Sequence, residues 1–414
     1  MRQSKVVFWL LAASLISGCS SNGSGALPTQ PAGGPGPMSA RSAIESPSEA
    51  LAIARGAGIA REYTLTDLGT GVPGSPGFSV NGLNIRGEVL LNASAGQLGS
   101  LPSCGLPNQL PCGPPVALIY RDGTLHVLPP LEKKQTAFVD AINDEGITGG
   151  YSTDSVTQSA VLWKRDLSIV NFGTGITPPD SGAEIDAINN HGEVFGDSFN
   201  ATTDIPIIFD SDNDNKPIAP CGSGVMGYFN VANDEGVGVG TEILSAGGTA
   251  AMTCPPFKVI ASPPNPKWIN FGFSINNRGE VVGRLSVGPT IKNFHPFLYR
   301  DGKVIDIGTP LFPGNKSAVG AADDINNAGT VVGWMAAGGG VIGPPRILPI
   351  DPKAFIYCGG RTVEINKLLP ESVAKEWDVI ITAVINDRGQ IAGIAYKGGY
   401  PNGVQHAVLL TPVI

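Results

Sequence analysis

The sequence predicts an all-β protein, a seven-bladed β-propeller of four-stranded antiparallel blades that is closed by pairing of its N- and C-terminal strands. Three observations lead to this fold class. A phrase of the type Ile-Asn-(Asn/Asp)-x-Gly-x-Val occurs seven times, and its asparagines lie 43 to 60 residues apart. Short apolar runs bounded by turn residues fill each interval, and the two ends of the folded region carry complementary pieces of one repeat. Periods of this size are typical of propellers, solenoids and arrays.

The phrase itself is expected to form a turn, because its asparagine can cap the turn through its side chain and its glycine can adopt a positive φ. We expect this turn to form the last hairpin of each blade. The acidic residues that follow several turn glycines (Glu88, Glu193 and Glu280) recur with the same period, which indicates a role in the fold. The turn glycines are Gly87, Gly146, Gly192, Gly236, Gly279, Gly329 and Gly389.

A second turn signal completes the unit. Asp301-Gly302 separates the apolar run 297–299 from the alternating run 303–307, and Asp-Gly between two such runs is a strong hairpin signal. The folded region begins at residues 63–69, which match the second strand of this hairpin, and ends at 406–410, which match the first. Pairing of these two segments would close the ring and leave no exposed sheet edge. We therefore assign residues 63–414 to one propeller.

Composition limits the classes of function. The chain has 414 residues, of which 42% are hydrophobic and 15% are charged, so it can form a core. Its formal net charge is −8 and it has no cluster of Lys or Arg, which argues against nucleic acid as a partner. Beyond residue 18 no apolar run is long enough to span a bilayer. We expect a monomer without a cofactor.

Residues 1–18 are predicted to be a signal peptide. Arg2 and Lys5 precede an apolar run at 6–16, and Ser17-Gly18-Cys19 follows it. This segment resembles the bacterial lipobox, and the resemblance implies that Cys19 is acylated and becomes the new N-terminus. A cysteine that carries two or more acyl chains anchors a protein stably to a membrane. The residue after the cysteine is not acidic, which implies the outer membrane of the cell envelope. An ordinary secretory leader is the alternative.

The next segments connect this anchor to the propeller. Residues 19–45 are rich in Ser, Gly, Pro and Ala and are predicted to be a flexible tether. Residues 46–62 are predicted to be a short helical lead-in, because Ser46-Pro47-Ser48-Glu49 forms a capping box ahead of an apolar run.

Parts of three repeats resemble a known family. The segments 295–299, 353–357 and 406–409 are similar to the His-Ala-Phe motif of the bacterial extracellular HAF repeat family, and the Ile-Asn-x-x-Gly-x-Val-x-Gly phrase belongs to the same pattern. The resemblance covers roughly residues 63 to 414 and implies an exported repeat protein with a propeller-like fold. Only His295 and His406 keep the histidine. The resemblance implies no reaction.

The remaining cysteines suit an exported protein with disulfides. The spacing favours pairs 104–112 and 221–254, which involve Cys104, Cys112, Cys221 and Cys254 and leave Cys358 over, although other pairings stay open. No histidine lies near these pairs at zinc-ligand spacing. The segment 210–215 resembles the start of a calcium loop but lacks the usual Gly and Glu, so we interpret it as a hairpin tip and expect no metal.

The alternating strand directions predict on which face of the ring a binding site would lie. The Asp-Gly and Asn-x-x-Gly turns must lie on one face of the ring, and the longer links must lie on the other. A binding site is favoured on the loop-bearing face. The sequence contains no catalytic motif, and His295 and His406 share one repeat position, so we assign no catalytic residue. The predicted long loops are 92–115, 241–256, 334–351 and 367–378.

These observations favour a lipid-anchored, non-enzymatic scaffold that binds a protein or glycan ligand through its loop-rich face. The alternative is a propeller enzyme, such as a lyase or hydrolase, with a site in the central channel. Enzymes of that kind gather charged or His side chains from several blades, and the chain has only four His.

Overall fold

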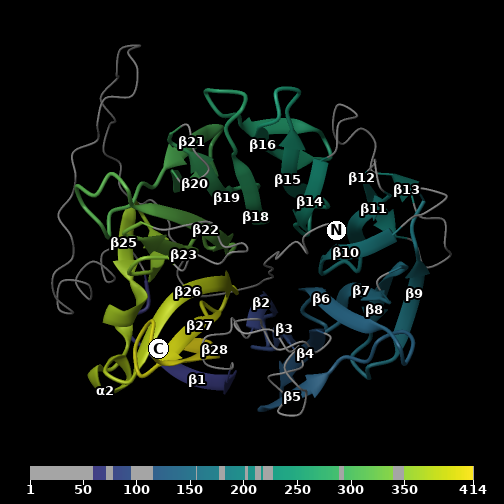
Figure 1. Cartoon of the computed structure of the whole chain (residues 1–414), viewed down its shortest axis with the longest axis horizontal. Helices are drawn as coiled ribbons and strands as arrows, with labels where there is room; N and C mark the ends of the chain where they lie inside the picture. The colour runs from purple at the N-terminus through teal and green to yellow at the C-terminus, as the bar shows by residue number, and fades with distance from the viewer. Residues whose placement is uncertain are drawn as a thin grey trace, which may run out of the picture.

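The chain forms seven antiparallel sheets, each with four strands, and Figure 1 shows these sheets arranged as blades around a common axis. The fold is therefore the seven-bladed β-propeller that the repeats predict. We number the blades 1 to 7 along the chain and count the strands of each blade outward from the axis. This computed structural model describes residues 59–70, 78–94, 115–154, 156–176, 182–200, 204–209, 216–217, 227–288, 293–338 and 349–413.

The first four blades follow one another along the chain, and their innermost strands β2, β6, β10 and β14 lie nearest the axis in Figure 1. Blade 1 consists of β2 (Phe78–Leu83), β3 (Val89–Ser94), β4 (Pro115–Arg121) and β5 (Thr124–Val127). Blade 2 consists of β6 (Thr136–Ile142), β7 (Thr148–Thr153), β8 (Gln158–Trp163) and β9 (Ile169–Gly173). Blade 3 consists of β10 (Gly182–Ile188), β11 (Val194–Phe199), β12 (Asp204–Phe209) and β13 (Lys216–Pro217). Blade 4 consists of β14 (Gly227–Ala232), β15 (Gly238–Ile243), β16 (Thr249–Cys254) and β17 (Lys258–Ala261).

The last three blades complete the ring. Blade 5 consists of β18 (Phe271–Ile275), β19 (Val281–Ser286), β20 (Phe294–Arg300) and β21 (Lys303–Asp306). Blade 6 consists of β22 (Val319–Ile325), β23 (Val331–Ala336), β24 (Lys353–Cys358) and β25 (Arg361–Glu364). Two short helices, η2 (Ile365–Leu368) and α2 (Glu371–Ala374), lead to blade 7, which consists of β26 (Trp377–Ile385), β27 (Ile391–Lys397), β28 (Val404–Pro412) and β1 (Tyr63–Thr70).

The pairing of β1 with β28 confirms the predicted closure. The register runs from Tyr63 opposite Pro412 to Thr70 opposite His406, so the N-terminal strand is the outermost strand of blade 7. His406 Nδ1 lies 2.8 Å from Asp67 Oδ1, which ties the two ends of the folded region together. His295 makes the same kind of contact with Asp306 inside blade 5. Both histidines of the shared repeat position therefore hold a third strand to a fourth strand.

Each motif asparagine caps its own turn as predicted. Asn276 shows the geometry, because its Oδ1 accepts the backbone N–H groups of Arg278 and Glu280, both at 3.0 Å. The turn glycine of this copy, Gly279, has φ of 72°, and the seven turn glycines have φ between 72° and 82°. A side chain would be strained in this left-handed conformation, which explains why every copy carries glycine there.

The same asparagine also joins neighbouring blades. Asn276 Nδ2 donates a hydrogen bond to the backbone carbonyl of Asn326 in the next blade at 3.0 Å. Every motif asparagine makes this bond to the next one at 2.8 to 3.5 Å, and Asn386 of blade 7 donates to Asn84 of blade 1. The result is a closed ring of seven hydrogen bonds around the axis, which we call the asparagine ring.

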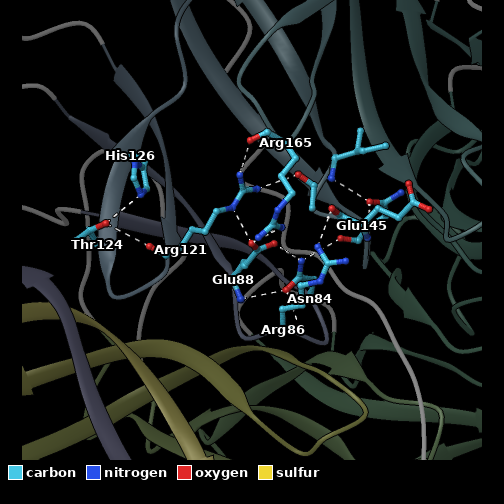
Figure 2. A network of polar contacts seen from close by, with 11 residues as sticks. Asn84, Arg86, Glu88, Arg121, Thr124, His126, Glu145 and Arg165 are labelled. Carbon is cyan, nitrogen blue, oxygen red and sulfur yellow. Dashed lines mark hydrogen bonds and ion pairs between the residues drawn. The ribbon is translucent and has the colours of Figure 1, made fainter.

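Acidic residues after the turn glycines reinforce the asparagine ring (Figure 2). Glu88 Oε2 accepts the side-chain amide of Asn84 at 2.6 Å, while its Oε1 pairs with Arg121 and Arg165, each at 2.7 Å. Arg121 also donates to the carbonyl of the turn glycine Gly146 in blade 2 at 3.0 Å. This network, in which Glu88 and Arg121 are buried and Arg165 is exposed, links two blades and confirms that the periodic glutamates serve the fold.

A β-bulge interrupts each innermost strand three residues before the motif asparagine. On the second strand beside the bulge, blades 5 and 6 have Gly283 and Gly333, where a Cβ atom would collide with the carbonyls of Phe271 and Ala321. The glycine at the end of the longer Ile-Asn-x-x-Gly-x-Val-x-Gly phrase is therefore required by backbone packing. The bulged residues are Asn81, Asp140, Asp186, Asn230, Phe273, Asp323 and Ala383.

Two details of the sequence prediction need correction. The phrase forms the first hairpin of each blade, between the two innermost strands, and not the last one. The repeat alone cannot fix this phase because the same alternation of hairpins fits either grouping. Of the lead-in predicted as helical, only residues 59–62 are described, and these contain no helix.

The asparagine ring leads to a prediction about stability. Replacing Asn276 with Ala removes the cap and the link to blade 6 and leaves buried N–H and C=O groups without partners, so we expect the free energy of unfolding to fall by about 2–4 kcal/mol. Denaturant unfolding measures the change. Asn402→Ala, at an exposed position, is the matched control and should change stability by less than about 0.5 kcal/mol. Equal unfolding midpoints for both variants would contradict the role of the ring.

Candidate functional site

The two faces of the ring differ as the strand directions require. The face that carries the Asn-x-x-Gly and Asp-Gly turns is called the turn face, and the opposite face, with the remaining links, is called the loop face. Of the predicted loops, 367–378 is present with its two short helices, and large parts of 92–115 and 334–351 lie outside the described residues. The predicted loop 241–256 is wrong, because β15 and β16 occupy most of it. Its small residues pack as buried strands.

A cavity of about 490 Å³ opens on the loop face over blades 6 and 7. It is formed by the link that precedes β24, the start of β26 and the link between β27 and β28. A second cavity of about 310 Å³ lies on the other side of Asp378. The two cavities therefore share the carboxylate of Asp378. The residues that line the larger cavity are Pro349, Ile350, Asp351, Pro352, Asp378, Tyr400 and Pro401.

Asp378 is held in place by its neighbours. Its Oδ1 accepts the side-chain amide of Asn366 at 2.8 Å, and its Oδ2 lies 3.4 Å from the backbone N–H of Tyr400. Burial raises the pKa of the Asp378 carboxyl above its usual value, and Asp351 adds to this effect. Asn366 also donates to the carbonyl of Val379 and accepts its N–H, which fixes η2 against β26. The carboxylate is thus preorganised at the boundary of the two cavities.

Apolar surface surrounds this carboxylate. Tyr400 donates its hydroxyl to the carbonyl of Pro349 at 2.8 Å and packs edge-on against Tyr396 at 5.1 Å. Ile350 is 62% exposed, although its backbone is fixed by two hydrogen bonds to Ala337 and Gly338. A rigid backbone that presents an exposed apolar side chain beside two carboxylates is typical of a binding surface. The sequence did not single out these residues individually.

The bulged residues of the innermost strands form a second set of functional candidates. Five of the seven are Asp or Asn, and all five are buried. Asn81 donates to Asp140 in the next blade at 3.1 Å, and Asn230 donates to the carbonyl of Gly272 at 2.7 Å. Bulges commonly re-aim side chains beside functional sites. Here, however, several of the bulged residues already serve as links between blades.

Blade 3 contains a group of carboxylates with the geometry to hold a cation. Within the described part of the chain, one oxygen from each of Glu184, Asp186 and Asp197 lies within 4.8 Å of the others. Gln158 of blade 2 donates to Glu184 at 2.8 Å. Burial raises the pKa of Tyr151 in blade 2, and the nearby carboxylates Asp140, Glu184 and Asp186 add to that shift. Sequence reasoning missed this group because its members are spread over two strands.

Other histidines and the cysteines do not assemble a site among the described residues. His191 Nδ1 lies 2.9 Å from the carbonyl of Asp234, and His126 Nε2 lies 3.0 Å from the hydroxyl of Thr124. Cys254 and Cys358 are both buried and disulfide-bonded, so the prediction that Cys358 is left over is wrong. Proximity along the chain misled that prediction, because a folded ring brings distant segments together. Cys19, Cys104, Cys112 and Cys221 lie outside the described residues.

The disulfide pairings follow a simple constraint. Cys254 and Cys358 are each disulfide-bonded, and the chain has six cysteines. The predicted pairs 104–112 and 221–254 can both hold only if Cys358 is bonded to Cys19. The individual pairings therefore stay predictions, and acylation of Cys19 requires that at least one of them be replaced.

The turn face carries a second ring of hydrogen bonds. The residue after each motif asparagine accepts the backbone N–H of its counterpart in the preceding blade, as when Asp144 accepts from Ile85 at 2.9 Å. Six such links exist, and the series stops at Ile85, which has no polar side chain. Burial raises the pKa of Asp144 to about 7, and the carboxylates of Asp234 and Asp387 add to the shift. Burial likewise raises the pKa of Asp387.

The fold and these sites define the class of the protein as a seven-bladed β-propeller with polar residues around its axis and an open cavity on one face. No family model matches the chain, and no curated protein matches it. Among the described residues no helix has the length and apolar character needed to cross a bilayer.

Several solved propellers are similar in fold. One is a catalytically inactive virginiamycin B lyase from Staphylococcus aureus, at 10% identity with a TM-score of 0.48, covering 85% of this chain and 100% of that chain. A gluconolactonase from Xanthomonas campestris has 10% identity and a TM-score of 0.33, over 64% of this chain and 82% of that chain. An acylaminoacyl peptidase from Pyrococcus horikoshii has 14% identity and a TM-score of 0.40, over 65% and 45%. At these identities the likeness concerns the fold alone.

The raised pKa of Asp144 leads to a prediction about pH. The folded state holds this proton more tightly than the unfolded chain, so the stabilising contribution is complete below the unfolded pKa of about 4 and is lost as the pH rises to about 7. Asp144→Asn should therefore be more stable than the wild type at pH 8, by about 1 kcal/mol, and the gain should vanish near pH 4. Thermal unfolding across this pH range measures it.

The reciprocal variant is the control for this prediction. Asn190→Asp places a carboxylate at the equivalent position of blade 3, so it should lose stability as the pH rises. Parallel behaviour of the two variants with pH would contradict the assignment.

Proposed function

We propose that the protein is an exported, lipid-anchored binding protein of the cell envelope, without catalytic activity, that holds a glycan ligand in the loop-face cavity over blades 6 and 7. The observation that carries the proposal is the pair of open cavities that share Asp378. Their combined lining of prolines, a tyrosine and an exposed isoleucine offers apolar surface for the flat face of a sugar ring. The two carboxylates, Asp351 and Asp378, offer acceptors for sugar hydroxyls.

Charge supports a neutral polar ligand over an anionic one. Among the described residues the larger cavity is lined by two carboxylates and no basic residue, and the smaller one adds Glu376 and Lys375. The chain as a whole has a net charge of −8. An acidic surface repels phosphate groups, which makes nucleic acid and anionic lipid headgroups poor ligands. A polypeptide ligand remains the other outcome of the binding experiment below.

The anchor supports the proposed location. The lipobox-like segment ending at Cys19 predicts acylation, and the resemblance of the repeats to the HAF family implies export. The tether 19–45, of about 27 residues, would have a root-mean-square reach of roughly 25–30 Å if it behaves as a flexible chain. Such a reach would let the propeller turn its loop face toward ligands at the surface of the membrane.

One observation favours the alternative, an enzyme with its site at the ring's axis. The carboxylates Glu184, Asp186 and Asp197 converge in blade 3, and converging acidic groups are suited to acid–base or metal-assisted chemistry. Turnover of a panel of glycosides and esters by the full chain, and its loss in Asp186→Asn, would favour this alternative over the binding role.

The ligand proposal predicts the effect of a charge-neutral substitution in the cavity. Asp351→Asn keeps the shape and tolerates the positive φ of 50° at this position, but it weakens the acceptor. We expect the dissociation constant for the bound glycan to rise about ten-fold, which corresponds to about 1.4 kcal/mol. A glycan array with the full chain in detergent identifies the probe, and titration calorimetry then measures the affinity.

The matched control is Asp301→Asn. Asp301 has φ of 52° at a hairpin tip on the turn face of blade 5, so it shares the backbone geometry but not the location. It should leave binding unchanged. Binding of a protein and of no glycan on the array would overturn the ligand class, and equal weakening by both variants would overturn the site.

The anchor proposal has its own test. Cys19→Ala removes the only atom that could carry the lipid at this position, so the variant should move from the membrane fraction to the soluble fraction of the envelope. Fractionation of cells that express the full chain measures the shift, with Ser20→Ala at the neighbouring position as the control. A Cys19→Ala variant that stays with the membranes would exclude anchoring through this residue.

A further inference from the structure

Arg284 of β19 stands apart from the framework of the repeat. It lies eight residues after the motif asparagine of blade 5, and this position varies from blade to blade, unlike the turn glycine. A framework position repeats because every blade needs it, whereas a varied position can serve one blade alone. The other blades carry Asn92, Tyr151, Asp197, Thr241, Trp334 and Ile394 at this position.

Three phenylalanine rings surround the guanidinium group of Arg284. Its Cζ lies 4.6 Å from the ring centroid of Phe271, 4.8 Å from that of Phe294 and 5.7 Å from that of Phe273. Phe271 and Phe273 belong to the innermost strand of the blade and are partly exposed. A cation over an aromatic face is stabilised by about 0.5–2 kcal/mol. The rings therefore hold the guanidinium in place without using its N–H groups.

None of the described residues provides an acceptor for these N–H groups. No described residue forms a hydrogen bond or an ion pair with the guanidinium of Arg284. Burial lowers the pKa of Arg284 to about 10, which still leaves the group charged at neutral pH. The Arg284 side chain is half-buried, and burying a charged group is costly unless acceptors or opposite charges meet it. The fork of N–H donors is therefore available to a ligand.

Among the described residues the nearby carboxylates form no ion pair with this cation, although Asp323 interacts with it electrostatically. Asp323 of blade 6 is 4% exposed, and its Oδ2 has no hydrogen-bond partner among the described residues. Burial and the neighbouring Asp324 raise the pKa of Asp323 well above its usual value, and the charge of Arg284 opposes this shift. Asp324 itself is occupied, since it accepts the hydroxyl of Ser274 at 2.7 Å and the N–H of Ile385 at 2.6 Å.

We propose that Arg284, together with Phe271 and Phe273, forms a binding site for a small carboxylate that carries an apolar body, at the boundary of blades 5 and 6 near the axis of the ring. The planar guanidinium matches a carboxylate with two parallel hydrogen bonds. The rings contact the apolar body of the ligand.

The surroundings favour a singly charged ligand. Phosphate at neutral pH carries up to two charges and needs several donors, whereas this site has one cation and lies in a protein with a net charge of −8. Its aromatic walls would leave the outer oxygens of a phosphate without partners. A carboxylate with a hydrophobic substituent satisfies both parts of the site. This site is separate from the loop-face cavity, so the proposal of a carboxylate site does not depend on the proposed function.

Titration of the full chain in detergent tests the proposal, with sodium benzoate as the probe and inorganic phosphate as the comparison. Benzoate should raise the melting temperature in a saturable manner and give a binding isotherm by calorimetry. Arg284→Gln should weaken benzoate binding at least ten-fold, and Arg284→Lys, which keeps the charge but loses the planar fork, should weaken it to a smaller extent. Arg388→Gln, at an exposed turn position, is the control and should bind benzoate as the wild type does.

Each other outcome counts against the site. Unchanged benzoate binding in Arg284→Gln, or no binding to the wild type, would overturn it. Tighter binding of phosphate than of benzoate would overturn the ligand class. If Arg284→Gln does not fold, Phe271→Leu supplies the readout, because it removes a ring from the site while Arg284 remains, and it should also weaken benzoate binding several-fold.

Discussion

One side-chain amide, repeated in every blade, holds the ring together. The motif asparagine uses its oxygen to cap its own turn and its nitrogen to bind the backbone of the next blade, as Asn276 does toward Asn326. Each bond needs the neighbouring turn to be formed, and the last one returns to Asn84. A single blade cannot bury its faces alone, so the ring gains stability only as neighbours assemble. The amide is suited to this task because it donates and accepts without carrying a charge.

The second ring of hydrogen bonds, on the turn face, shows how a carboxylate differs from an amide at the same position of the repeat. Asn190, Asn277 and Asn327 accept the same backbone bond that Asp144 accepts, but Asp144 adds a charge close to Asp234 and Asp387. Repulsion and burial oppose ionisation there. The interruption at Ile85 falls in blade 1, beside the blade that is completed by β1. The His406–Asp67 contact and the β1–β28 pairing supply a separate lock at that junction.

The local structure could be read from the sequence, whereas contacts between blades could not. The Asn-x-x-Gly and Asp-Gly signals locate turns because they act through residues close in the chain, and the φ of Gly279 and Asp301 confirms them. The link from Asn276 to Asn326 joins two repeats, and a periodic pattern carries no distance between repeats. The stretch 249–254 lies inside the segment 241–256 that the sequence predicts as a long loop, yet it forms a strand whose side chains are all buried. The cavity at Asp378 needed three separate links to be brought together.

Each repeat contains positions that are the same in every blade and positions that differ between blades, and this difference bears on function. Positions that every blade needs, such as the turn glycine and the motif asparagine, cannot be changed in one blade without weakening the ring. Positions beside the bulge are free of that constraint, and there the blades differ in charge and size: carboxylates meet in blade 3, whereas blade 5 places Arg284 among phenylalanines. Specific binding therefore can arise near the axis as well as in the links of the loop face. The recurrent phrase makes both places possible, because it fixes the backbone on which the differing side chains stand.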